Sequence, residues 1–223
     1  MTKKLFIPLL VLTTAMFAYA PIVIAQAPFE STMLLVQKIF YFHLPSWLVM
    51  FSAIAVCGVA SAVYLFKGDI RADRIAVSAA EIAVVFGSFG FVTGMLWGRK
   101  AWGVWWQWDA RLTTALLLEL ILLAYLVLRR YGGPGSEKLA AGVALFGMAD
   151  SVIVYKSVDW WRTVHPTTNV MASLGQTSPE MYGAMLYCSA AFLMLFALLM
   201  IARVGLENRR AELDQLFLAV EEH

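Results

Sequence analysis

The sequence predicts an all-α integral membrane protein with six transmembrane helices. Of its 223 residues, 61% are hydrophobic and 14% are charged, which leaves too little polar surface to solvate a globule. The apolar residues also come in long runs rather than in periodic stripes. A helix needs about 20 apolar residues to cross a bilayer core of roughly 30 Å. Six runs approach that length, at about 5–25, 44–66, 75–96, 112–128, 139–155 and 182–202.

The first run resembles a secretory signal peptide. Lys3 and Lys4 precede an apolar stretch that leads to the small-residue pattern AYA at 18–20, as at a cleavage site. Pro21 follows this pattern directly. Since proline just after the scissile bond makes a poor cleavage site, we expect an uncleaved first helix that starts in the cytoplasm.

Basic residues predict how the helices are oriented, because Lys and Arg concentrate in cytoplasmic segments. With the N-terminus inside, the outer segments are 26–43, 97–111 and 156–181. Eleven basic residues then lie inside: Lys3, Lys4, Lys67, Arg71, Arg74, Arg129, Arg130, Lys138, Arg203, Arg209 and Arg210. Six lie outside: Lys38, Arg99, Lys100, Arg111, Lys156 and Arg162. The difference favours a cytoplasmic location for both termini.

The chain divides into a six-helix membrane domain over 1–204 and a cytoplasmic tail over 205–223, which we expect to form a short solvated helix. Its inner loops are short, with the turn sequence GGPG at 132–135, and no nucleotide-binding loop is present. Cys57 and Cys188 lie in the second and sixth runs without a Cys-x-x-Cys pattern, so we expect both to be packing residues. We expect no nucleic-acid partner.

Tryptophan gathers in the segment WGRKAWGVWWQWDARLT at 97–113. Five of the chain's eight tryptophans lie within twelve residues here: Trp97, Trp102, Trp105, Trp106 and Trp108. Trp160 and Trp161 lie in another outer segment, and Trp47 begins the second run on the same side. An aromatic belt would place indoles at both membrane interfaces, and the inner interface has none. A belt therefore explains Trp47 but not the whole set.

A short interfacial helix over 98–111 would give the tryptophans a common face. Trp102, Trp105, Trp106 and Asp109 stand at i, i+3, i+4 and i+7, so they would share one side of such a helix. With indoles on both sides, this helix would contact lipid on one side and a planar apolar ligand on the other. Asp109 would orient an indole N–H or pair with Arg111; the alternative is a helix-start cap with a salt bridge.

Two histidines flank the tryptophan segment in the sequence. His43 precedes Pro45, which suits the first turn of the second helix, and His165 follows Trp160 and Trp161. Taken alone, each is more often an ordinary interfacial residue. Two imidazoles that approach an aromatic shelf from two sides are what a bis-histidine haem requires. The candidate partners for the haem propionates are Arg99, Lys100, Arg111 and Arg162.

These segments carry a family resemblance. WGRKAWGVWWQWDARLT is similar to the tryptophan-rich WWD signature of the haem-handling membrane proteins of cytochrome c maturation. The length, the six runs and one histidine on either side of the motif resemble the C component, also called haem exporter protein C. YFHLPSW and SVDWWRTVHP resemble that family's histidine-bearing segments. Larger relatives with this signature have more helices and more histidines.

The resemblance implies a haem-presenting role at the periplasmic face of a bacterial inner membrane. Haem b would be held transiently as cargo by His43 and His165 as axial ligands. The implied platform and its surroundings are Trp97, Trp102, Trp105, Trp106, Trp108, Asp109, Arg111, Trp160, Trp161 and Arg162. Cargo would pass to a periplasmic haem chaperone, the E component, with transporter components A and B and a small D component as further partners. The covalent bond forms on the chaperone, so this chain would not be a conventional enzyme.

Two rival functions stay open from the residues. A membrane cytochrome b would also bind haem between histidines, but would normally hold them at mid-membrane. A haem-translocating transporter would need a midplane site, and the runs show no broken helix pair or internal repeat. Three acidic residues within the runs, Glu81, Glu119 and Asp150, predict helix–helix hydrogen bonds or contact with a partner subunit. His223, at the cytoplasmic end, should be dispensable.

Overall fold

The computed structural model describes residues 2–166 and 178–221, and His223 lies outside them. Within these ranges, six helices are long and apolar enough to cross a membrane. They are α1 (Thr2–Gln26), α2 (Phe40–Lys67), α3 (Ile70–Ala101), α4 (Ala110–Tyr131), α5 (Ser136–Trp160) and α7 (Pro179–Glu221), with a short 3₁₀ helix, η1 (Leu35–Ile39), before α2. The predicted fold class, an all-α protein with six membrane-spanning helices, is confirmed.

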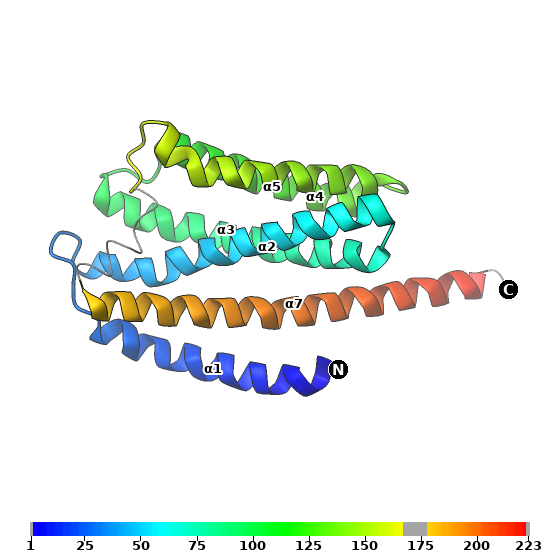
Figure 1. Cartoon of the computed structure of the whole chain (residues 1–223), viewed down its shortest axis with the longest axis horizontal. Coiled ribbons are helices and arrows are strands. Elements are labelled where there is room, and N and C mark those ends of the chain that lie inside the picture. The colour runs from blue at the N-terminus through cyan, green and yellow to red at the C-terminus, as the bar shows by residue number, and fades with distance from the viewer. Residues whose placement is uncertain (1, 167–177, 222–223) are drawn as a thin grey trace.

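The helices lie side by side as a stack of layers (Figure 1). α4 and α5 pair with each other, α2 packs against α3, α5 and α7, and α1 packs against α7 at the far side. The N-terminus of α1 and the C-terminal part of α7 lie at the same end of the bundle (Figure 1). The segments with tryptophan lie at the opposite end, and which end faces the cytoplasm stays a prediction.

The turns at the tryptophan-free end are built by glycine and by side-chain caps. Gly68 ends α2 with a left-handed φ of 67°, and its N–H bonds to Tyr64 O at 2.8 Å. Asp69 then caps α3 by accepting a 2.8 Å hydrogen bond from the Arg71 N–H. The predicted turn at 132–135 joins α4 to α5, and Gly135 precedes α5 with a φ of 88°. Glycine populates such positive φ values at little steric cost.

The predicted interfacial helix over 98–111 is wrong. α3 runs on to Ala101, the Trp102 N–H bonds to Gly98 O at 2.7 Å, and Gly103 then takes a left-handed φ of 78°. Residues 102–109 form an irregular segment. The helix ends because a left-handed residue turns the backbone away from the helical path. Asp109, in an extended conformation, begins α4 as its N-cap.

The tail also differs from its prediction. Residues 205–221 continue α7 rather than forming a separate short helix, and this part of α7 projects beyond the other helices (Figure 1). An α-helix needs a break such as proline or a left-handed residue to end, and the described part of the tail has neither.

The three acidic residues within the helices behave differently from one another. Glu81 on α3 accepts a 2.5 Å hydrogen bond from Arg203 Nε of α7. Glu119 on α4 accepts a 2.8 Å bond from Ser88 Oγ of α3. Both confirm the predicted helix–helix hydrogen bonds. For Asp150, Oδ2 is buried and has no partner among the described residues, so the prediction is not confirmed there. Cys57 and Cys188 are buried and unpaired, in keeping with a packing role.

Candidate functional site

A cavity lies at the tryptophan-rich end of the bundle, among α2, α3, α4 and α5. About 850 Å³ within it and at its open mouth is free of protein atoms. Its lining is mostly apolar and aromatic, and both outer histidines contribute to it. The lining residues are Phe40, His43, Leu44, Trp47, Gly90, Phe91, Gly94, Met95, Trp97, Trp102, Trp105, Trp106, Arg111, Leu112, Ala115, Val154, His165 and Pro166.

His43 is held on α2 by a neighbouring helix. Its Nδ1 lies 3.1 Å from the carbonyl oxygen of Gly90 and 3.1 Å from Oγ1 of Thr93, both on α3. A carbonyl oxygen can only accept a hydrogen bond, so Nδ1 carries the proton. The other ring nitrogen, Nε2, then keeps its lone pair. Metal-binding histidines are commonly fixed in this way, through an N–H that donates to a carbonyl.

Glycines let α3 approach this part of α2 closely. A Cβ on Gly94 would lie 3.0 Å from Cε1 of His43, and one on Gly90 would lie 2.9 Å from Cε2 of Trp47. Contacts this short are closer than packed carbon atoms allow. The absence of these two side chains therefore creates the space that His43 and Trp47 occupy.

His165 lies in the segment after α5, and its Nδ1 lies 3.0 Å from the carbonyl oxygen of Pro166. By the same reasoning Nδ1 donates to that carbonyl, and Nε2 is free. Burial lowers the pKa of His165 from its ordinary value, because desolvation disfavours the charged form. The imidazole ring lies 6.4 Å from the Trp102 ring, centroid to centroid. Both histidines can therefore present neutral imidazole nitrogens to one cavity.

Asp109 ties the His165 segment to the start of α4. Its Oδ1 accepts a 2.8 Å hydrogen bond from the Leu112 N–H, which is the helix cap. Its Oδ2 accepts from the Thr163 hydroxyl and, at 3.2 Å, from the Val164 N–H. Of the two readings of Asp109, the helix-start cap is confirmed. Asp109 does not line the cavity with Trp102, so its predicted place on a shared tryptophan face is wrong.

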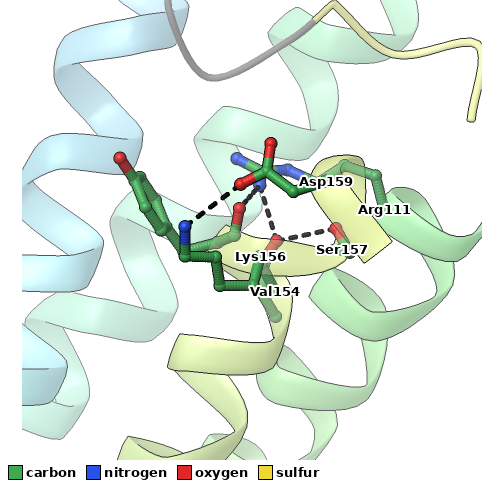
Figure 2. Close-up of polar contacts among 6 residues, drawn as sticks. Arg111, Val154, Lys156, Ser157 and Asp159 are labelled. Carbon is green, nitrogen blue, oxygen red and sulfur yellow. Dashed lines mark hydrogen bonds and ion pairs between the residues drawn. The ribbon is translucent and has the colours of Figure 1, made fainter. Parts of the chain in front are cut away.

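Arg111 lines the cavity and also crosses from α4 to the end of α5. Its Nη1 donates to the carbonyl oxygens of Val154 at 2.5 Å and Tyr155 at 3.1 Å, and Ser157 Oγ also donates to the Val154 oxygen (Figure 2). Helix C-termini attract cations because their last carbonyls lack helical partners. The predicted salt bridge with Asp109 is therefore replaced by a contact with the α5 backbone.

The tryptophans fall into two groups. Trp97, Trp102, Trp105 and Trp106 line the cavity. Trp106 Nε1 is buried and has no acceptor within residues 2–166 and 178–221. Trp108, Trp160 and Trp161 do not line it and are 76%, 58% and 50% exposed; Arg162 is exposed as well. Once 102–109 is irregular rather than helical, the position of each indole depends on local backbone turns that periodicity does not describe.

The assignment of Trp47 to an aromatic belt is wrong. Trp47 lines the cavity beside His43, with the two rings 6.2 Å apart, and packs edge-on against Phe91 at 5.3 Å. It stands four residues after His43 on α2, which is the spacing of side chains on one helix face. This spacing, which is visible in the sequence, indicates that Trp47 lies beside His43.

The chain matches the sequence profile of the family described as "Heme exporter protein C" over residues 1–218. A heme exporter protein C of Bradyrhizobium diazoefficiens is 37% identical over 183 residues, which cover 80% of this chain and 69% of that protein. The chain belongs to the heme exporter protein C family. The Escherichia coli heme exporter protein C is 31% identical over 194 residues, covering 81% and 76% of the two chains. A mitochondrial protein of Marchantia polymorpha, whose name includes cytochrome c biosynthesis, is 32% identical over 158 residues, covering 70% and 66%.

Sequence reasoning missed several cavity residues of this heme exporter protein C family member. The Gly90 carbonyl fixes the tautomer of His43, and Phe40 and Phe91 add aromatic surface; Thr93, outside the lining, also contacts the His43 ring. The glycines at 87, 90 and 94 are spaced by three and four residues within an apolar run, and small residues at such spacing mark close helix packing in membranes. Phe40 and Phe91 carry no comparable signal, since aromatic residues are frequent throughout the chain.

Proposed function

We propose that this protein binds haem in the cavity, with His43 and His165 as axial ligands, and presents it at the periplasmic face to a haem chaperone for c-type cytochrome biogenesis. The observation that carries the proposal is that His43 and His165 have the same hydrogen-bonding arrangement. Each histidine donates its Nδ1 proton to a backbone carbonyl, which leaves Nε2 free, and both line one aromatic cavity. Haem iron accepts two such nitrogens, one on each side of its ring.

The cavity residues fit the other parts of haem as well. Trp47, Trp97, Trp102, Trp105 and Trp106 offer flat apolar surface to a macrocycle. The Trp106 N–H, which has no acceptor among the described residues, and the guanidinium of Arg111 suit carboxylate groups such as the propionates. Haem b is cargo in this proposal, so the residues bind it, orient it and exclude water, and apart from the iron–imidazole bonds no bond is made or broken on this chain. The protein is therefore not a conventional enzyme.

The family and the distribution of basic residues support a proposal for where this function takes place and with which partners. The relatives are named heme exporter protein C, which supports a haem-handling role with other components of a haem export system. We propose that the chain lies in the bacterial inner membrane, that its cavity faces the periplasm, and that residues 205–223 lie in the cytoplasm. The partners would be the periplasmic chaperone and the transporter components A and B with the small D component. His43 lies in the first turn of α2 and His165 just after α5, and both line one cavity, which favours presentation over electron transfer across the bilayer.

Single replacements of the histidines test this proposal. His43→Ala or His165→Ala removes one axial nitrogen, so each variant should still insert in the membrane and should lose low-spin haem. Added imidazole should restore part of the low-spin absorbance, because it fills the vacated coordination position. His223→Ala is the matched control and should keep the full signal. If both cavity variants keep an unchanged low-spin spectrum, the ligand assignment is refuted.

A further inference from the structure

A second, open groove lies between α2 and α3 at the end of the bundle away from the cavity. Its walls are apolar and mostly small, and charged side chains occur at one end. The lining residues are Ala55, Val56, Val59, Ala60, Val63, Asp69, Arg71, Ala72 and Ile75. Ala55 and Val59 are exposed on its outer side. Since α2 and α3 are long and apolar enough to cross a membrane, this groove opens towards lipid.

The groove extends over most of one membrane leaflet. Its α2 residues, from Ala55 to Val63, span about 12 Å at roughly 1.5 Å per residue, and Asp69 and Arg71 follow just after the end of α2. One leaflet contributes about 15 Å, half of a hydrocarbon core of roughly 30 Å. An acyl chain that fills the groove would therefore begin at its charged end and finish near mid-membrane, beside Ala55.

Two opposite charges stand together at the end of the groove. Asp69 and Arg71 are both exposed, and no ion pair within residues 2–166 and 178–221 involves either of them. Other charges nearby have partners: Asp73 pairs with Arg129 at 2.6 Å, and Arg74 donates to Asn208 at 3.0 Å. One oxygen of Asp69 caps α3, so a ligand that enters the groove meets the second Asp69 oxygen and the Arg71 guanidinium, and neither group has an ion-pair partner among the described residues.

We propose that this groove binds a phospholipid with a primary ammonium headgroup, of the phosphatidylethanolamine type. One acyl chain lies along the α2 face that contains Val59, the phosphate contacts Arg71, and the ammonium contacts the carboxylate of Asp69. A primary ammonium donates up to three hydrogen bonds. The quaternary ammonium of phosphatidylcholine donates none, and phosphatidylglycerol has no cation to contact Asp69.

Retention of defined lipids by the purified full-length chain tests the proposal. The protein, stripped of native lipid in detergent, is incubated with equal amounts of dioleoyl phosphatidylethanolamine, phosphatidylcholine and phosphatidylglycerol. Lipid retained after gel filtration is counted by mass spectrometry. We expect phosphatidylethanolamine to exceed each of the others by roughly threefold to tenfold, as for one hydrogen-bonded charge pair.

Variants separate the headgroup contact from the acyl contact. Asp69→Asn keeps the helix cap, since asparagine caps as well as aspartate does, and should remove the preference over phosphatidylcholine while some lipid is still retained. Val59→Trp fills the groove and should reduce retention of all three lipids. Val85→Trp, at a residue of α3 that is 63% exposed and outside the groove, is the matched control and should change nothing.

Three results would overturn the proposal. They are equal retention of the three lipids, a preference for phosphatidylglycerol, and unchanged lipid retention in Val59→Trp. A single-span protein found in the groove in place of lipid, cross-linked through residue 59, would likewise overturn it. None of these measurements involves haem, so their outcome is independent of the proposed function.

Discussion

Replacing Asp109 with asparagine should release the His165 segment while leaving α4 intact. Asparagine keeps an oxygen that can accept from the Leu112 N–H, so the helix cap is retained. The second position changes from an acceptor to an amide donor, and it faces two donors, the Thr163 hydroxyl and the Val164 N–H. The hydroxyl can rotate and accept from the new amide. The Val164 N–H has no such option and loses its partner.

The size of the effect follows from these contacts. A hydrogen bond to a charged group is worth about 1.5–3 kcal/mol, and the value falls when water reaches the site, as it does at the exposed Val164. A net loss of about 1–2 kcal/mol lowers the ratio of docked to undocked segment by a factor of roughly 5–30. His165 belongs to that segment, because its N–H bonds to Thr163 Oγ1 at 3.0 Å.

Absorbance of the haem-loaded protein measures this effect. In Asp109→Asn, low-spin absorbance should fall, high-spin absorbance should rise, and helix content by circular dichroism should stay unchanged. Asp159→Asn is the matched control, because it removes the same charge from an exposed pair with Lys156 at 3.2 Å near the end of α5. An unchanged low-spin spectrum in Asp109→Asn, or an equal loss in both variants, would refute the conclusion that Asp109 holds the His165 segment in place.

Two further outcomes are expected. Gly90→Ala should lower the thermal unfolding temperature, because its Cβ would meet Trp47 at 2.9 Å and overpacking costs about 1–3 kcal/mol. Gly142→Ala is the control, because a Cβ there would have nothing within 4 Å. Its unfolding temperature should equal or exceed that of the unsubstituted protein, since alanine favours helix over glycine by about 1 kcal/mol. A lower unfolding temperature for Gly142→Ala than for Gly90→Ala would contradict the close contact of α2 with α3. Because burial lowers the pKa of His165, its imidazole stays neutral below the ordinary value of about 6.5, so low-spin haem should persist on acidification to that pH and be lost only at lower pH. If low-spin haem were lost with a midpoint above about pH 6.5 in a spectral pH titration, the lowered pKa of His165 would be contradicted.

The helices could be predicted because the hydrophobicity of a membrane span is summed over about 20 consecutive residues. Long apolar runs predict spans whatever the neighbours are, and all six were found. The helix ends could not be predicted as well, because they depend on single contacts such as the Asp69 cap and the left-handed Gly68. α3 accordingly begins at Ile70 and ends at Ala101, beyond both ends of its predicted run.

The sequence indicates which residues gather at the candidate site better than it indicates how they are arranged. His43, His165 and four of the clustered tryptophans do line one cavity. The shared helix face that was expected to unite the tryptophans does not exist, because Gly103 breaks the helix. Tertiary packing brings the indoles together instead. The hydrogen bonds that fix the two imidazoles come from a helix partner and a backbone turn, and no pattern in the sequence specifies them.

The two histidines are held with unequal rigidity, and a protein that gives up its cargo can use this difference. His43 is fixed between α2 and α3, where Gly90 and Gly94 bring the helices together, so moving it requires the helix pair to separate. His165 lies on a segment held through Asp109 by two hydrogen bonds. Opening there costs far less than separating packed helices. Haem should therefore be released from the His165 side first, and Asp109→Asn should raise the rate of haem dissociation more than Thr93→Val, which removes a contact of His43. A larger increase in Thr93→Val would mean that the α2 side opens instead.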